Sequence, residues 1–303
     1  MNQEPKFIII KRKTRLEELV FRYNTREQAK FYVEHLGQDF SLYIDEDREY
    51  TEALQKAISY LEAMGKVQVV DRSFLPNFLF GKSDIVIAIG QDGLVANTLK
   101  YLDQQVLIGV NPSPKRYDGT LLPFQVDDLK SIIKEVVLYR RPIKEVTMAK
   151  AILNDGLEML GVNDLFIGQK SHVSARYHLQ IGEKSEVQSS SGIIVSTGLG
   201  ATGWLKSILQ GAAGIALQPI KPIEMPWDSS YLMFSVREPF PSLVSKAELT
   251  FGRIEEGKFL QITSWMPENG VIFSDGMEND YLEFTSGKIA TIGIEKRRGK
   301  LVV

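Results

Sequence analysis

Residues 84–94 read DIVIAIGQDGL, an apolar run followed by two glycines that enclose Gln91 and Asp92. An apolar run of this length is typical of a parallel strand that is buried on both faces. Glycines after such a strand let backbone N–H groups approach an anion, and ligands of open α/β sheets bind at the carboxyl ends of the strands. The stretch therefore predicts an α/β domain with a ligand-binding turn at residues 90–93.

Strands and helices are expected to alternate on both sides of this stretch. Three more apolar runs predict strands, at residues 7–10, 67–70 and 106–111. Three segments have the spacing of amphipathic helices, at residues 26–36, 49–64 and 126–139. The alternation predicts a doubly wound, mostly parallel sheet in a first domain that spans residues 1–140.

After about residue 140, short β-like segments replace this alternation, separated by turn signals such as NDG, ENG and SDG. The expected strands lie at residues 146–153, 165–167, 177–181, 193–196, 231–236, 247–251, 260–264, 271–274 and 289–294. Residues 141–303 are therefore expected to form a β-rich second domain, with the chain from about residue 289 able to return to the first domain.

Composition narrows the function classes. The 303 residues carry 36 Lys and Arg against 38 Asp and Glu, a formal net charge of -2, which gives no electrostatic reason to expect nucleic acid or an anionic membrane as a partner. The absence of cysteine excludes disulfides and thiolate metal sites and fits a reducing compartment. No apolar run approaches the roughly 20 residues of a membrane span, and the start, MNQEPKFIIIKRK, leaves no room for a targeting peptide. We expect a cytoplasmic protein.

A second glycine-rich stretch, IIVSTGLGATGW at residues 193–204, contains the pattern G-x-G-x-x-G at Gly198, Gly200 and Gly203. A dinucleotide-binding Rossmann fingerprint opens a βαβ unit and has an acidic residue about 20 positions further on. Glu224 has a suitable distance, but it lies in a proline-rich segment inside the β-rich region. The sequence therefore favours a glycine turn with another role over a Rossmann crossover.

Asp92 has two interpretations. Its carboxylate would repel a phosphate, but it suits a group that accepts the proton of an attacking hydroxyl during phosphoryl transfer. Aspartate is also a favoured N-cap, so Asp92 could simply begin the following helix.

Five segments resemble, in order and spacing, motifs of the NAD kinase and diacylglycerol kinase superfamily. IAIGQDGL resembles its G-G-D-G-T loop, and LIGVN resembles the strand that follows. GVNDLFIG is similar to its Asn-Glu motif, IIVSTGLGATGW to its VIVSTPTGSTAY segment, and FSDGMENDYLEF to its late Asp-Gly. KTRLEELVFRY and MFSVREPF make the chain most similar to the mitochondrial-type branch of the NAD kinases.

The resemblance implies an enzyme that transfers the terminal phosphoryl group of ATP, or of polyphosphate, to the 2′-hydroxyl of the adenosine ribose of NAD, giving NADP. It implies Asp92 as the general base and Mg²⁺ accompanying ATP, without a resident metal. The nucleotide phosphates would meet the segment formed by Gly90, Gln91 and Gly93, together with Asn111.

For the NAD side, the resemblance implies a site made of Asn163, Asp164, Thr202, Gly203, Trp204, Ser207 and Asp275. It also implies a homo-oligomer, a dimer or a tetramer, assembled through the β-rich domain.

Three residues depart from the family pattern. Gln91 stands in place of the second glycine of the loop and would cost about 1–2 kcal/mol in left-handed backbone. Leu94 replaces a threonine and removes a hydroxyl, and Asp164 replaces a glutamate that is one methylene longer. We therefore expect intact NAD recognition and altered handling of the phosphoryl donor.

Two other functions stay open: a non-catalytic NAD(P)-binding homologue with a degenerate phosphate loop, and a lipid or sphingoid kinase of the same superfamily. His172 and His178 are spaced unlike common metal ligands and are expected to be structural. The basic segment KRKTR, residues 11–15, is expected to be a solvated loop rather than a phosphate site.

Overall fold

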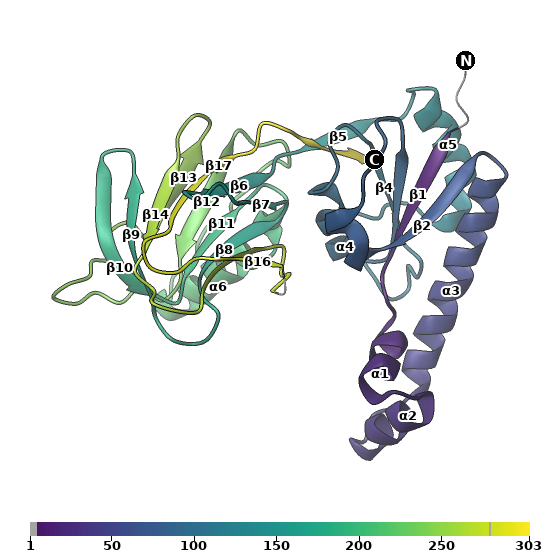
Figure 1. Cartoon of the computed structure of the whole chain (residues 1–303), viewed down its shortest axis with the longest axis horizontal. Coiled ribbons are helices and arrows are strands. Elements are labelled where there is room, and N and C mark those ends of the chain that lie inside the picture. Colours follow the sequence, from purple (N-terminus) through teal and green to yellow (C-terminus); the bar gives the residue numbers. More distant parts are fainter. Residues whose placement is uncertain (1–4, 279) are drawn as a thin grey trace. The chain divides into compact units, whose positions relative to one another are not determined.

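The computed structural model of the chain describes residues 5–278 and 280–303. The chain forms two compact units (Figure 1). The first extends to Ile143 and takes back Lys300–Val303, whereas the second consists of Lys144–Gly299. The predicted combination of an α/β domain and a β-rich domain is confirmed.

The first unit is built on a six-stranded sheet with the order β2-β1-β3-β4-β18-β5. Its strands are β1 (Lys6–Lys11), β2 (Lys66–Asp71), β3 (Ile85–Ile89), β4 (Leu107–Val110), β5 (Ile143–Val146) and β18 (Gly299–Val302). Parallel pairing joins β2, β1, β3, β4 and β18. Strand β18 lies between β4 and β5, so the sheet receives one of its inner strands after the chain has passed through the second unit.

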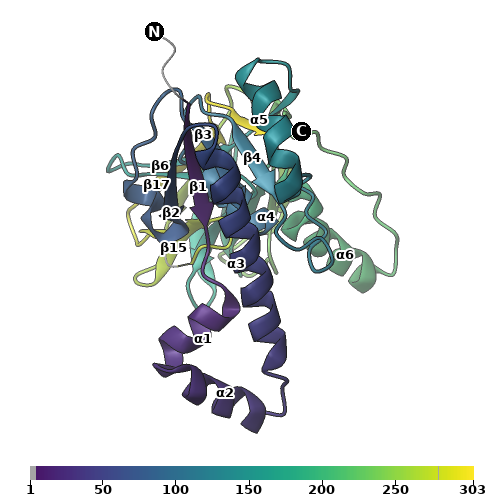
Figure 2. The ribbon, with the colours of Figure 1, turned by 90° about the vertical axis from the view of Figure 1, so that its right-hand side faces the viewer.

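Helices cover both faces of this sheet. The long helix α3 (Ser41–Glu62) and α5 (Leu129–Val137) pack on one face, where Phe7, Ile87 and Leu61 are fully buried in a common cluster. Helix α4 (Asp92–Leu99) lies on the other side of the sheet (Figures 1 and 2). Short 3₁₀ helices occupy Arg72–Asn77 and Val126–Asp128.

Helices α1 (Arg15–Tyr23) and α2 (Arg26–His35) extend away from the sheet with the first turns of α3 (Figure 2). Helix α1 begins at a capping box, in which Thr14 Oγ1 accepts from the Glu17 N–H and Glu17 Oε2 accepts from the Thr14 N–H. The three helices enclose a small apolar cluster of their own around Leu16, Val33 and Phe40.

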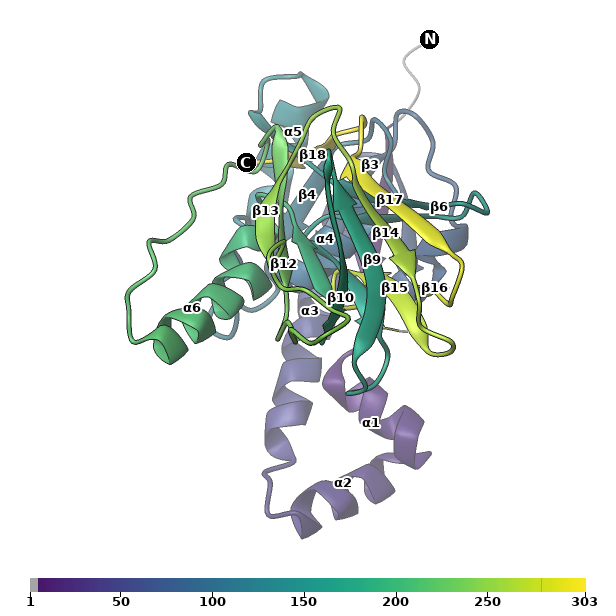
Figure 3. The ribbon, with the colours of Figure 1, turned by 90° about the vertical axis from the view of Figure 1, so that its left-hand side faces the viewer.

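The second unit contains two antiparallel six-stranded sheets (Figure 3). One has the order β10-β9-β14-β17-β6-β7 and consists of β6 (Ala149–Leu153), β7 (Glu158–Gly161), β9 (Ala175–Ile181), β10 (Lys184–Ser190), β14 (Leu260–Ser264) and β17 (Ile289–Ile294). The other has the order β13-β12-β11-β8-β15-β16 and consists of β8 (Asp164–Gln169), β11 (Ile193–Ser196), β12 (Tyr231–Val236), β13 (Phe251–Glu255), β15 (Gly270–Ser274) and β16 (Tyr281–Glu283). A 3₁₀ turn at Gly200–Thr202 leads into α6 (Trp204–Ala216).

Alternation along β8 decides which side chains are available for function. Leu165 and Ile167 point into the apolar core that both sheets of the second unit share. Asp164 and Phe166 therefore lie on the opposite face, since successive side chains of a strand point to opposite sides. Phe166 packs there against Trp204 of α6.

Several predicted elements differ from the structure. The expected helix at residues 49–64 begins eight residues earlier, at Ser41. The expected strand at residues 247–251 is wrong, because β13 begins only at Phe251. Helix α1 and strand β10 carry polar residues at many positions and were not predicted, and the short strand β7 was not predicted either.

Candidate functional site

The turn at residues 90–93 follows a fully buried strand of the first unit. All five residues of β3 are buried, and Gly90 donates its N–H to the carbonyl of Val110 on the neighbouring strand. Gln91 is the N-cap of α4, with φ of −124° and ψ of 164°. The expected strain at Gln91 is therefore wrong, because extended backbone suits any side chain.

Asp92 is the first residue of α4 and does not cap it. Its Oδ1 accepts from the N–H of Leu121 at 2.8 Å, across a loop 29 residues further along the chain. No hydrogen bond to its other oxygen, Oδ2, is formed within residues 5–278 and 280–303. The half-buried carboxylate is thus fixed by one oxygen, and the other can accept a proton.

Leu94 belongs to the core of the first unit. Its side chain is only 2% exposed, and its Cδ2 lies 3.0 Å from the position that a methyl group on Gly90 would occupy. A methyl group on Gly93, in contrast, would meet nothing within 4 Å. The turn is therefore closely packed at Gly90 and open at Gly93.

Asn111 shapes a neighbouring loop. It is buried, its Nδ2 donates to the carbonyl of Tyr117 at 2.9 Å, and its Oδ1 accepts from the N–H of Ser113 at 3.0 Å. Gly119, which has φ of 65°, lies close to the Asn111 amide. A methyl group on Gly119 would lie only 2.7 Å from Asn111 Nδ2. Through these contacts, Asn111 holds the loop at residues 112–119 in place.

The expectation of a solvated basic loop is wrong for Arg12. This residue is only 8% exposed, and its guanidinium donates to Glu46 at 3.0 Å and to the Tyr117 hydroxyl at 3.1 Å. Burial disfavours the charged form of Glu46, but hydrogen bonds from Arg15 and Arg12 outweigh it and keep the pKa of Glu46 below its usual value. Sequence reasoning could not find this ion pair because its partners are 34 positions apart.

In the second unit, Asp275 holds together the turn that contains Asn163. Its carboxylate accepts from the backbone N–H groups of Val162, Asn163 and Asp164, with its shortest contact, 2.6 Å, to Asn163. Asp275 has φ of 54°, a left-handed conformation that aspartate tolerates better than most residues. The structure thus brings Asn163, Asp164 and Asp275 together.

The carboxyl of Asp164 is unusual because its Oδ1 is buried and has no hydrogen-bond partner among residues 5–278 and 280–303. Burial raises its pKa to about 7, with the neighbouring Asp275 adding to the increase and a hydrogen bond with Ser196 opposing it. The burial of Asp164 therefore favours its neutral, protonated form.

The glycines of residues 198–203 serve close packing. A methyl group on Gly198 would collide with the carbonyl oxygen of Pro226, and one on Gly200 would collide with the carbonyl oxygen of Asn163. The Thr197 N–H donates to that same Asn163 oxygen at 3.0 Å. The stretch is a packed turn between an antiparallel strand and α6, which excludes the Rossmann crossover that the glycine pattern left open.

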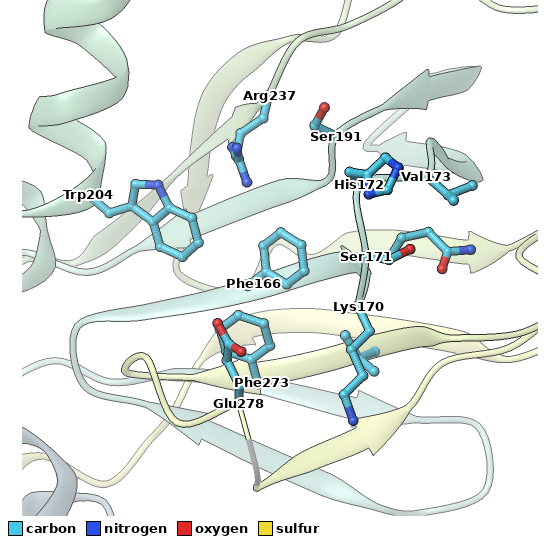
Figure 4. A pocket seen from close by; sticks show the side chains of 12 residues that line it. Phe166, Lys170, Ser171, His172, Val173, Ser191, Trp204, Arg237, Phe273 and Glu278 are labelled. Atoms are coloured by element: carbon cyan, nitrogen blue, oxygen red, sulfur yellow. The ribbon is translucent and has the colours of Figure 1, made fainter. Parts of the chain in front are cut away.

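Trp204 lines a cavity of about 360 Å³ that lies within the second unit (Figure 4). Its ring stacks on Phe166, with centroids 5.9 Å apart, and the Arg237 guanidinium lies 5.5 Å from the Trp204 centroid. Phe273 extends this aromatic wall, while Lys170 lies on the other side of the cavity. The cavity combines flat apolar surface with cationic groups.

The other predicted residues of the second unit lie at the start of α6. Thr202 and Gly203 are exposed, and Ser207 is exposed with its hydroxyl 3.3 Å from the Gly203 carbonyl oxygen. Within the described ranges, no group of three or more His, Asp or Glu side chains is arranged to hold a metal ion. His172 lines the cavity of Trp204.

Known proteins share both sequence and fold with this chain. No protein-family model matches it. A probable NADH kinase of Oryza sativa subsp. japonica is 25% identical over 218 residues, which cover 64% of this chain and 63% of the relative. NAD kinase 2 of Geobacillus kaustophilus is 22% identical over 147 residues, 47% of this chain and 53% of the relative. The chain matches less than two thirds of the length of either curated relative.

Two solved structures have a similar fold. Yeast NADH kinase complexed with NADH superposes with a TM-score of 0.61 at 12% identity, over 100% of this chain and 84% of that chain. An NAD kinase from Archaeoglobus fulgidus in complex with ATP superposes with a TM-score of 0.59 at 15% identity, over 98% and 93%. The fold is that of the NAD kinases, and the resemblance to that family is confirmed, while the similarity to its mitochondrial-type branch stays a prediction.

Among the helices of residues 5–278 and 280–303, none combines the length and the apolar character that crossing a membrane requires.

Proposed function

We propose that this chain, which is related in sequence to the NAD kinases and has their fold, transfers a terminal phosphoryl group from ATP or polyphosphate to the 2′-hydroxyl of the adenosine ribose of NAD. The product is NADP. The relatives' names include both NAD and NADH kinases, so both forms of the dinucleotide are candidate acceptors.

The observation that carries this proposal is the position of Asp92. Its Oδ1 accepts from the Leu121 N–H, which orients the carboxylate. Its Oδ2 then accepts the hydroxyl proton while the ribose oxygen forms its bond to phosphorus and the bond from phosphorus to the donor's leaving oxygen breaks. Asp92 is the proposed general base.

The phosphoryl donor is proposed to bind at the turn formed by Gly90, Gln91 and Gly93. The open space at Gly93 and the N-terminus of α4 both favour a phosphate there. Asn111 contributes by shaping the loop next to the turn rather than by presenting a free amide.

Mg²⁺ is proposed to arrive with the donor. Mg²⁺ is usually bound by one or two carboxylates together with substrate phosphates, and Asp92 offers such an oxygen. Bound there, it would screen the negative charge of the phosphates.

NAD recognition is assigned to the second unit. Asn163, on the turn that Asp275 holds, is proposed to bind the ribose or the base, and Trp204 to stack on an aromatic ring of the dinucleotide. Asp164, Thr202, Gly203, Ser207 and Asp275 complete the proposed site. Asp275 acts chiefly by fixing the turn at residues 162–164, since its carboxylate accepts from backbone N–H groups, whereas Oδ1 of Asp164 is buried.

The experiment is a coupled assay of NADP and NADPH formation from NAD and NADH, with ATP and with polyphosphate. Asp92→Asn keeps an oxygen for the Leu121 N–H but cannot take the proton, so turnover should fall by about 10²–10⁴-fold with NAD binding retained. Asp71→Asn, a helix-capping carboxylate of the same unit, is the matched control and should keep full activity. Undiminished turnover in Asp92→Asn would remove the proposed base.

The same assay tests the non-catalytic alternative, for which NAD binding without product is the signature. We further propose a cytoplasmic homo-oligomer, a dimer or a tetramer. Light scattering coupled to size-exclusion chromatography measures that state directly, and a monomer at micromolar concentration would contradict it.

A further inference from the structure

Behind the turn at residues 90–93 lies a buried cation with one unused donor. Arg12 follows β1, and its side chain is about nine-tenths buried. The Nε–H group has no acceptor among residues 5–278 and 280–303. A buried N–H without an acceptor is costly, so such groups in folded proteins call for an explanation.

The other nitrogens of this guanidinium are occupied. One terminal nitrogen donates to Glu46 Oε1 at 3.0 Å and to the Tyr117 hydroxyl at 3.1 Å, and the other donates to the carbonyl of Lys13 at 3.0 Å. The backbone of Arg12 is fixed as well, because its N–H donates to the Tyr50 hydroxyl at 3.1 Å. The side chain is therefore held in one orientation while Nε is left unpaired.

The unpaired Nε faces the glycine turn. A methyl group on Gly90 would lie 3.6 Å from Arg12 Cδ and 3.7 Å from Arg12 Nε, so the Arg12 side chain passes next to Gly90 with Nε at van der Waals distance from the turn. The Tyr50 hydroxyl, which binds the Arg12 N–H, donates to the carbonyl of Ile89 at 3.0 Å and ties Arg12 to the end of β3. Burial raises the pKa of Tyr50 to about 12, so its hydroxyl keeps the proton that it donates.

Charge favours an anion at this place. Glu46 is shared between Arg12 and the exposed Arg15, so two cations meet one buried carboxylate. The N-terminus of α4, which begins at Asp92, adds its partial positive charge on the same turn.

We propose that Arg12 Nε donates a hydrogen bond to a phosphate oxygen of the phosphoryl donor bound at the 90–93 turn. This inference rests on the proposed function and adds to it the residue that selects a phosphate chain. Arg12 thereby connects the turn at residues 90–93 with α3 and with the loop that contains Tyr117, and these segments form one anion-binding site. The ligand class is a phosphate chain, whether of ATP or of polyphosphate.

Direct binding tests the proposal apart from catalysis. Calorimetry with ATP and, separately, with polyphosphate should show affinity reduced by about ten- to a hundredfold in Arg12→Gln, the loss expected of one charge-assisted hydrogen bond. NAD affinity, measured alongside, should stay within a factor of two. Weakened binding of both phosphate chains supports the proposal even if no NADP forms, so its outcome is distinct from that of the activity assay.

Arg15→Gln is the matched control, because Arg15 pairs with the same Glu46 but is half exposed. ATP affinity in this variant should be close to that of the wild type. Equal losses in Arg12→Gln and Arg15→Gln would mean that Arg12 only neutralises Glu46, which would overturn the proposal.

A measurement on the unchanged protein covers the case in which Arg12→Gln does not fold. The ¹⁵N–¹H signal of Arg12 Nε should shift on addition of ATP or of polyphosphate and stay in place on addition of NAD. A signal that ATP leaves unmoved at saturation would overturn the assignment. Gly90→Ala, which fills the space next to Nε, should abolish the shift.

Discussion

The chain has two glycine-rich turns after buried strands, and they use glycine in opposite ways. In the first unit, Gly93 faces open space and the turn presents the side chain of Asp92. In the second unit, Gly198 and Gly200 lie against backbone carbonyl oxygens, and the turn is closely packed. The motif that looks more like a nucleotide loop, G-x-G-x-x-G, is the one whose glycines serve packing. The two turns therefore differ in the space next to these glycines, which the spacing of glycines along the sequence does not reveal.

The largest expected effect is on the unfolding free energy, and it tests the difference between the two glycine turns directly. Gly198→Ala or Gly200→Ala forces a methyl group into a carbonyl oxygen of Pro226 or Asn163 and should lower the free energy of unfolding by about 3 kcal/mol or more. Gly93→Ala, with nothing within 4 Å, should change it by less than about 0.5 kcal/mol. Urea unfolding followed by circular dichroism measures both, and equal losses at the two turns would break the comparison.

Asp275 holds the turn at residues 162–164, and Gly200 of the packed turn lies against the Asn163 carbonyl oxygen of that segment. Asp275→Ala removes the acceptor of three backbone N–H groups and leaves an alanine at positive φ, so we expect a loss of about 2 kcal/mol in unfolding free energy. Asp275→Asn keeps an acceptor oxygen and tolerates the conformation, and it should lose about half as much. NAD affinity should fall in the same order; an alanine variant with unchanged stability would contradict the role.

The raised pKa of Asp164 gives the second unit a pH dependence. The folded-state pKa of about 7 lies above the unfolded value near 3.8, so the unfolded chain gives up this proton first. Stability from this group is complete below about pH 4 and is lost as the pH rises towards 7, with a slope of at most about 1.4 kcal/mol per pH unit. Asp164→Asn should flatten the unfolding free energy measured from pH 4 to 7. Parallel curves for wild type and variant would refute the assignment.

Gln91 should have the smallest effect, and it tests the open turn. Its extended backbone carries no strain, so Gln91→Gly should change the unfolding free energy by less than about 0.5 kcal/mol and leave NADP formation unchanged. A substantially faster variant would show that the glutamine side chain obstructs the donor.

Much of the first unit could be predicted because its signals are local. The apolar run at residues 84–90 contains strand β3, and the glycine turn lies where this run ends. Helix α1 could have been found from its capping box, Thr14-x-x-Glu17, which sequence reasoning overlooked. The early start of α3 at Ser41 could not, because its first turns are stabilised by the apolar cluster shared with α1 and α2.

The second unit was harder to predict, because its polar strands are stabilised by distant partners. Strand β10 reads KSEVQSS and carries the buried Glu186, whose carboxylate accepts from the N–H groups of Glu248 and Leu249. In the candidate sites, the residue types were predictable from motifs. The burial of Arg12, the turn held by Asp275 and the unpaired oxygen of Asp164 depend on contacts between segments tens of residues apart.

The late arrival of β18 has a consequence for how the protein is made. This strand lies between β4 and β5, yet the ribosome synthesises it only after the whole of Lys144–Gly299. Until Lys300–Val303 emerges, β4 lacks the neighbour that Leu301 provides, and Arg141 lacks the carbonyl of Val303 that its Nε binds at 2.8 Å. During translation, the sheet of the first unit therefore lacks an inner strand until the whole of the second unit has been made.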